Sequence, residues 1–156
     1  MRKHVVLLLL IPLINGCIRH GKTDIVKVPI NYYNFKGITH GSKPSEVVAL
    51  FGEPVSIDSS RPGGYLCEDY HYKDISFGIV RDHVYKAVTY SSNYNPLGIS
   101  VGMKRGDVLK RMNVYGKCVN GRKEYQFITS EYGVCIVFKF NEQGILIEQG
   151  FSIDLP

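Results

Sequence analysis

The sequence predicts an α+β fold of two tandem units, each a helix followed by three antiparallel strands, with both helices packed on one face of the sheet. Three observations lead to this prediction. An amphipathic stretch within 38–54 ends in a Gly-Pro stop, a degenerate copy of it begins 61 residues later, and strand-like segments follow each copy. One such unit is too small to bury a core comfortably, whereas two can share a continuous sheet.

The 156 residues leave room for one domain or two very small ones, and local signals divide them into four parts. We expect a signal peptide at 1–16 and a lipidated tether at 17–37. A first helix and β-meander unit should follow at 38–95, and a second at 96–156.

The charge balance argues against a nucleic-acid partner. Nineteen basic residues against fourteen acidic ones give a formal charge of +5, but much of the excess lies in the first 37 residues. The folded part is therefore close to neutral, whereas a nucleic-acid binder needs a clustered basic face.

The amino terminus has the pattern of an export signal. A basic start precedes an apolar run at 5–14, which as a helix would rise only ~15 Å and could not span a bilayer. The run ends at Ile14-Asn15-Gly16-Cys17, which resembles the lipobox of bacterial lipoproteins.

That resemblance implies cleavage before Cys17, diacylglycerol on its sulfur and an acyl chain on its new amino group. Membrane lipid would then be a partner, because several acyl chains anchor a protein stably. Ile18 is not the Asp that retains such lipoproteins in the inner membrane, so the implied location is the outer membrane, facing the periplasm. The alternative is a secreted protein cut nearby, with Cys17 in a disulfide.

Residues 18–37 carry scattered charges and no helical period, which predicts a flexible tether. Alternation at Val26, Val28 and Ile30 leaves a short edge strand there as an alternative.

In the first unit, Val47, Leu50 and Phe51 are spaced to form one apolar stripe on a helix. Pro44 suits its first turn, and Gly52 suits a left-handed residue at its end. Turn-rich residues at 58–64 predict a loop, and strands are expected at 65–72, 75–80 and 84–91.

The second unit repeats this order. A helix is expected near 104–112, with Val108, Leu109 and Met112 facing inward, followed by strands near 124–129, 134–140 and 145–153. The 61-residue offset also aligns Tyr90 with Phe151, which predicts that Tyr90 points inward.

The segments Gly41-Ser42-Lys43-Pro44-Ser45-Glu46-Val47 and Phe138-Lys139-Phe140-Asn141-Glu142-Gln143-Gly144-Ile145-Leu146 resemble the SmpA/OmlA (BamE-like) family of small outer-membrane lipoproteins. The tandem arrangement is similar to the beta-lactamase-inhibitory-protein fold. Asn113 and Tyr115 depart from the pattern, because they stand where Gly52 and Pro54 stand in the first unit.

The sequence carries none of the familiar catalytic patterns. The five histidines include no H-E-x-x-H, and no G-x-S-x-G, Walker loop or dinucleotide fingerprint is present. Cys67 and His71 would sit about 13 Å apart on a strand, too far for proton transfer. We therefore expect no catalytic residue, no metal, no cofactor and no small-molecule substrate.

Three cysteines remain after Cys17, and their pairing cannot be deduced from sequence alone. A disulfide between Cys118 and Cys135 is favoured, because closing their short loop would stabilise the fold by about 3 kcal/mol in the chain-entropy model. Cys67 is expected to be a buried thiol.

The function expected from these features is a non-catalytic binding or scaffold role in the outer-membrane envelope, with another envelope protein as partner. Aromatic residues are enriched in interfaces, so the candidate binding surface consists of Tyr65, Tyr70, Tyr72, Tyr85 and Tyr125. The alternative is an inhibitor or immunity lipoprotein that occludes an enzyme or toxin.

Overall fold

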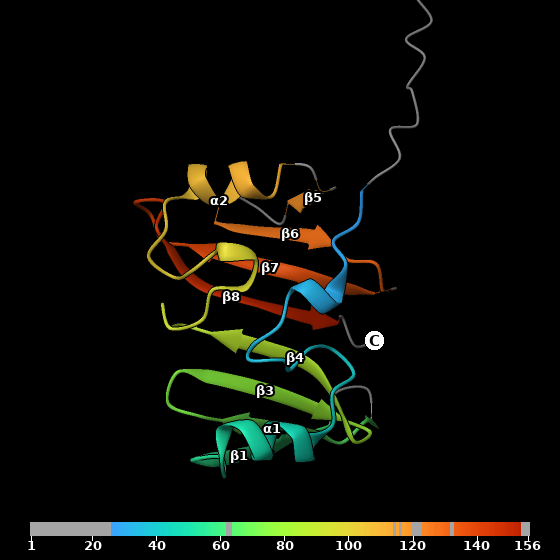
Figure 1. The fold of residues 1–156 in the computed structure, drawn as a ribbon. Coiled ribbons are helices and arrows are strands. Elements are labelled where there is room, and N and C mark those ends of the chain that lie inside the picture. The colour runs from blue at the N-terminus through green and yellow to red at the C-terminus, as the bar shows by residue number, and fades with distance from the viewer. Residues whose placement is uncertain are drawn as a thin grey trace, which may run out of the picture.

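A computed structural model describes residues 26–61, 64–113, 115, 117–119, 123–131 and 133–153, excepting the side chains of 117–119. Its strands form one continuous antiparallel sheet in the order β1-β2-β3-β4-β8-β7-β6-β5 (Figure 1). The strands are β1 Ser56–Ser60, β2 Cys67–His71, β3 Ile75–Val80, β4 His83–Thr89, β5 Lys117–Val119, β6 Glu124–Ile128, β7 Val134–Phe140 and β8 Leu146–Ile153.

The expected architecture of two helix-plus-three-strand units is therefore wrong. Four strands follow each helix, and the pairing of β4 with β8 makes a single sheet of all eight. The sequence predicts neither edge strand, because β1 is rich in Ser and Asp and overlaps the loop expected at 58–64, and β5 is only three residues long. Pairing with β2 and β6 holds them in place despite weak local preference.

Two short helices, α1 Pro44–Phe51 and α2 Arg105–Arg111, lie on one side of the sheet (Figure 1). The Glu46 carboxylate accepts a hydrogen bond from the Lys43 backbone N–H at 2.7 Å, which fixes the start of α1. Gly52 ends it with a φ of 79°. Within the described residues, no helix is both long and apolar enough to cross a membrane.

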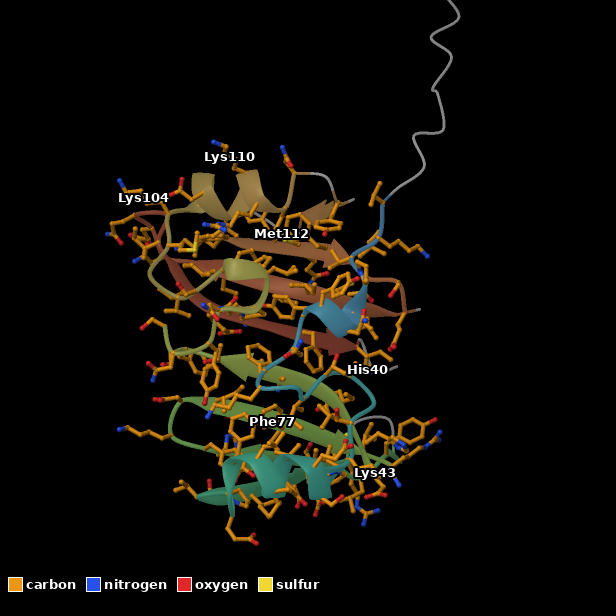
Figure 2. The ribbon with its side chains drawn as sticks, viewed as in Figure 1. His40, Lys43, Phe77, Lys104, Lys110 and Met112 are labelled. Atoms are coloured by element: carbon orange, nitrogen blue, oxygen red, sulfur yellow. The ribbon has the colours of Figure 1, made fainter. Side chains whose placement is uncertain are left out.

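The core lies between the sheet and these helices. Figure 2 shows Phe77 pointing from β3 into this layer and Met112 on the inner side of α2, with Lys104 and Lys110 pointing outward. Val108 and Met112 are fully buried, as predicted. Leu50 is 52% exposed, however, so the predicted stripe of α1 is wrong at this position.

Tyr90 is also placed differently from the prediction. It is 62% exposed because it follows the last residue of β4, where the sheet no longer covers it. Phe151 is buried and pairs with Ala87 in the neighbouring strand. The 61-residue offset therefore fails to predict the environment at this end of the sheet.

Residues 26–38, here called the strap, cross the helix side between α1 and α2 (Figure 1). The strap includes the 3-10 helix η1 Ile30–Tyr32, and a bridge from Val28 to Thr129 ties it to the sheet. Tyr33 and Phe35 are buried in the core, where Phe35 contacts Phe151. The predicted flexible tether therefore does not extend to residue 37.

Candidate binding surface

The side of the sheet away from the helices is here called the open face. Ala87 and Phe151 are buried toward the helices, so their neighbours Lys86, Val88, Gly150 and Ser152 face the opposite way. The strand register places alternate residues of β1, β2, β3, β6 and β7 on this same face. In the described chain, both helices and the strap lie on the other side (Figure 1).

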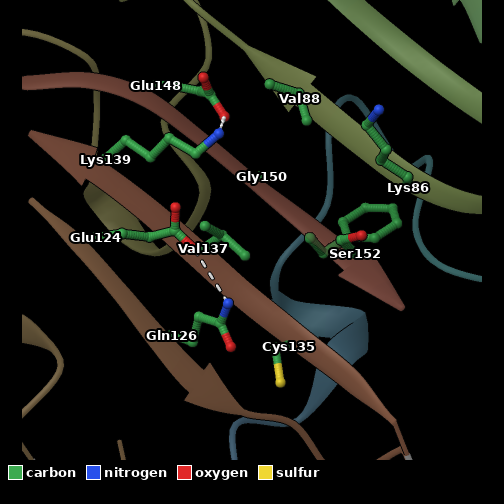
Figure 3. A pocket seen from close by; sticks show the side chains of 11 residues that line it. Lys86, Val88, Glu124, Gln126, Cys135, Val137, Lys139, Glu148, Gly150 and Ser152 are labelled. Atoms are coloured by element: carbon green, nitrogen blue, oxygen red, sulfur yellow. Dashed lines mark hydrogen bonds and ion pairs between the residues drawn. The ribbon is translucent and has the colours of Figure 1, made fainter. Parts of the chain in front are cut away.

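A hollow of about 210 Å³ lies on the open face, where β4, β8, β7 and β6 run side by side (Figure 3). Val88, Gly150 and Val137 are cross-strand neighbours at its centre and supply an apolar floor. Figure 3 shows charged side chains around this floor, with Glu148, Lys139 and Glu124 toward one end and Lys86 toward the other.

Gly150 is the residue that opens the hollow. A Cβ atom at this position would lie 2.1 Å from the Ala87 carbonyl oxygen, so no larger residue fits without moving the backbone. The missing side chain leaves space between Val88 and Val137. The close approach of β4 and β8 therefore requires a glycine at this position, and the glycine in turn leaves the hollow in the sheet surface.

The rim of the hollow is charged and internally paired. Lys139 Nζ lies 2.7 Å from Glu148 Oε1, and this hydrogen bond raises the pKa of Lys139. Gln126 Nε2 donates to Glu124 Oε1 at 3.1 Å. At the other end, Lys86 Nζ lies 3.7 Å from Asp69 Oδ1.

Tyr85 lies on the open face beside this hollow. Its ring covers Gly78, since a Cβ at Gly78 would lie 2.6 Å from Tyr85 Cε1. Burial, followed by the charge of Asp69, raises the pKa of Tyr85 to about 12. A bulge between Gly78 and Ile79 in the β3–β4 pairing leaves Tyr85 as the extra residue of β4 and positions its ring over Gly78.

The other predicted aromatic residues are distributed elsewhere. Tyr70, Tyr72 and Tyr125 pack against the core on the helix side, and the Tyr72 hydroxyl donates to the Gly52 carbonyl at 3.0 Å. Tyr65 lies in a loop, with the Arg81 guanidinium 4.4 Å from its ring centroid. The five tyrosines therefore do not gather into one surface.

A hydrogen-bonded chain that the sequence did not suggest lies on the open face of β1, β2 and β3. Ser76 Oγ is 3.0 Å from His71 Nδ1, and His71 Nε2 is 3.1 Å from Asp58 Oδ2. His71 lies only five residues before Ser76 and thirteen after Asp58, but the three side chains meet through the pairing of β1, β2 and β3 and not through a recognisable local motif.

The cysteines are only partly within the described chain. Cys67 is 1% exposed, which confirms the expected buried thiol, and Cys135 lines the hollow. Cys17 and the side chain of Cys118 lie outside the described residues, so lipidation and the disulfide stay predictions. No group of three or more potential metal-ligating side chains occurs in the described part of the chain.

No protein-family model matches this chain, and no curated protein matches it. It resembles an extracellular protein containing an SCP domain from Bacillus anthracis, with 17% identity and a TM-score of 0.56, covering 85% of this chain and 49% of that one. The chain thus spans about half the length of that protein. At this identity the likeness shows a shared fold alone.

A second similar structure is a proposed beta-lactamase inhibitor protein from Streptococcus mutans. It is 17% identical, with coverage of 84% of this chain and 92% of that one and a TM-score of 0.33. That score is too low to support an argument about function. Neither structure points to the SmpA/OmlA lipoproteins.

Proposed function

We propose that this chain is a non-catalytic binding domain of the cell envelope, and that the open face of its sheet contacts a partner protein. The hollow around Gly150 carries this proposal, because it combines an apolar floor with a charged rim on a sheet surface that the helices and strap of the described chain leave open. Buried apolar centres surrounded by polar rims are typical of protein interfaces.

The size of the hollow favours a protein over a small molecule as ligand. Its volume of about 210 Å³ is below the roughly 300–1,000 Å³ of ordinary small-molecule sites. Its rim consists of long charged side chains, which can pair with charges on a second protein and select it.

The Asp58–His71–Ser76 chain has the residue types of an acyl-transfer triad, but its surroundings favour a structural role. Acyl transfer needs preorganised donors for the oxyanion that forms. Ser76 lies in β3, which pairs with β2 on one side and β4 on the other. The backbone N–H groups around it are therefore engaged in the sheet hydrogen bonds and do not form an oxyanion site. We therefore interpret the chain as cross-strand hydrogen bonding that stiffens the open face.

An envelope location is supported by the sequence of the first 17 residues. If Cys17 is acylated, only residues 18–25 separate the lipid from the strap. Eight residues reach at most about 28 Å when fully extended. The folded part would then stay close to the membrane and meet partners there.

A photo-crosslinking residue at Val88 tests the open face in cells that produce the chain. The matched control is the same residue at Tyr32, which is exposed in the strap on the helix side. We expect one protein adduct from position 88 and none from position 32. Adducts from position 32 alone, or equally from both, would refute the use of this face.

The identity of that adduct decides between the two roles in the envelope. A component of outer-membrane assembly would make the chain a scaffold, whereas a hydrolase or toxin would make it an inhibitor or immunity protein.

The anchor has a separate test. Cys17→Ser should abolish palmitate labelling and leave the precursor uncut. Normal labelling of this variant would exclude lipidation at Cys17.

A further inference from the structure

We propose that the hollow on the open face receives an arginine side chain of the partner protein. This inference rests on the proposed function, and it names the chemistry of one contact within it. Arginine is enriched among the residues that dominate binding at protein interfaces.

The floor of the hollow suits the aliphatic part of an arginine. Val88 and Val137 flank Gly150, which contributes no side chain, so a slender chain of methylene groups can lie between them (Figure 3). Long basic side chains bury their stems in this way while keeping the charged group at a polar rim. The volume of about 210 Å³ fits one such side chain.

The rim supplies an excess of negative charge at one end. Lys139 is matched by Glu148 at 2.7 Å, and Lys86 faces Asp69 at 3.7 Å. Glu124 accepts a hydrogen bond from the neutral Gln126 and lies across the strand pair from this same Lys139, so two carboxylates share one ammonium group at this end of the hollow. A cation placed there completes the charge balance.

The geometry favours guanidinium over a simple ammonium group. Figure 3 shows Glu124 and Glu148 on either side of Lys139, so the two carboxylates face the same end of the hollow. A planar guanidinium can donate to two acceptors at once, whereas an ammonium acts as a point charge.

Tyr90 adds an aromatic surface near that end. Its side chain is 62% exposed, and the charges of Glu148 and Lys139 both act on its hydroxyl. A guanidinium that reaches Glu124 and Glu148 would come near this ring, where a cation–π contact is favourable.

A nuclear magnetic resonance titration tests the proposal without knowledge of the partner. The labelled protein is the mature chain with Cys17→Ser, and the probes are N-acetylarginine amide and its neutral isostere N-acetylcitrulline amide. We expect saturable shifts of the Val88, Val137 and Gly150 amide signals with the arginine probe. The citrulline probe should bind at least tenfold more weakly.

Two variants locate the charge. Glu124→Gln should weaken arginine binding about tenfold. Glu142→Gln should leave it unchanged, because Glu142 lies outside the hollow and pairs with Lys123 at 3.0 Å. Equal binding of both probes, shifts confined to other residues, no binding, or an unaffected Glu124→Gln variant would each overturn the proposal.

The crosslinking experiment keeps this inference separate from the proposed function. If position 88 crosslinks to a partner while the arginine probe fails, the open face binds a protein but the arginine anchor is wrong. If crosslinking at position 88 fails as well, both the proposed binding face and the arginine contact are wrong.

Discussion

Gly150 shows how the absence of one side chain determines both packing and surface shape. Gly150→Ala should destabilise the protein by about 3 kcal/mol, because the new Cβ would meet the Ala87 backbone oxygen, which cannot rotate away. Urea denaturation measured by circular dichroism gives the free energy of unfolding.

Gly106 provides the matched control. It lies in α2, and a Cβ there would meet no atom within 4 Å. Gly106→Ala should therefore raise the free energy of unfolding by about 0.5–1 kcal/mol through better helix propensity. Similar effects at both positions would show that Gly150 is not sterically constrained.

Tyr33 and Gln149 form a buried polar pair that is fully hydrogen-bonded. The Tyr33 hydroxyl donates to Gln149 Oε1 at 3.0 Å, and Gln149 Nε2 donates to the carbonyls of Tyr94 and Ile99 at 3.1 and 3.0 Å. Tyr33→Phe leaves the amide oxygen without this donor and should cost about 1–2 kcal/mol. Tyr32→Phe, at an exposed position, should have no effect on thermal unfolding.

Tyr33 also predicts a dependence of stability on alkaline pH. Burial raises the pKa of Tyr33 well above its ordinary value of 10.0. Below pH 10 the residue is protonated in both states and its stabilising effect is complete. Above pH 10 the unfolded chain loses the proton while the folded chain keeps it, so stability falls as pH rises.

The measurement is the free energy of unfolding between pH 9 and pH 11. One such group contributes a slope of up to about 1.4 kcal/mol per pH unit above its unfolded pKa. Tyr33→Phe should lose less stability over this range than the natural chain. An identical slope in the two proteins would contradict the buried position of the hydroxyl.

At the scale of elements, the strap contributes more than its sequence suggests. Phe35 makes edge contacts with the Tyr33 and Tyr94 rings and stacks on Phe151. Phe35→Ala should therefore cost about 3–5 kcal/mol, as large-to-small changes in a core do. Chemical denaturation checks this, and a cost below about 1 kcal/mol would mean that the strap is only loosely attached.

The elements differ in how far the sequence could predict them. The helix at 44–51 has strong local signals, namely Pro44 at its start and Gly52 at its end, so it was predictable. The strap is short and mixed in composition, and its structure depends on contacts with residues about 100 positions away. Local sequence patterns do not reveal contacts between residues this far apart.

The same limit applies to the candidate site. The tyrosines were chosen by residue type, but the strand register decides the face on which each one lies. Tyr85 reaches the open face through a bulge, while Tyr72 turns toward Phe77 on the helix side. The hollow depends on Gly150 lying between two valines from different strands, which only the pairing of β4, β8 and β7 brings about.

At the scale of the whole molecule, the pairing of β4 with β8 makes the sheet a single structural unit. The core runs without interruption beneath both helices. We therefore expect one cooperative transition, with the calorimetric enthalpy of unfolding equal to the van't Hoff enthalpy. Two separate transitions, or a stable fragment ending at residue 95, would show that the two halves fold independently.

The strap also constrains the order of events during synthesis. Tyr33 leaves the ribosome well before its hydrogen-bond partner Gln149, which is 116 residues further along the chain. A nascent polypeptide therefore cannot complete its core until β8 has emerged, and until then Tyr33 and Phe35 lack the strand that buries them. A chain with this topology stays incompletely folded, and so able to pass through an export channel, until β8 has been synthesised.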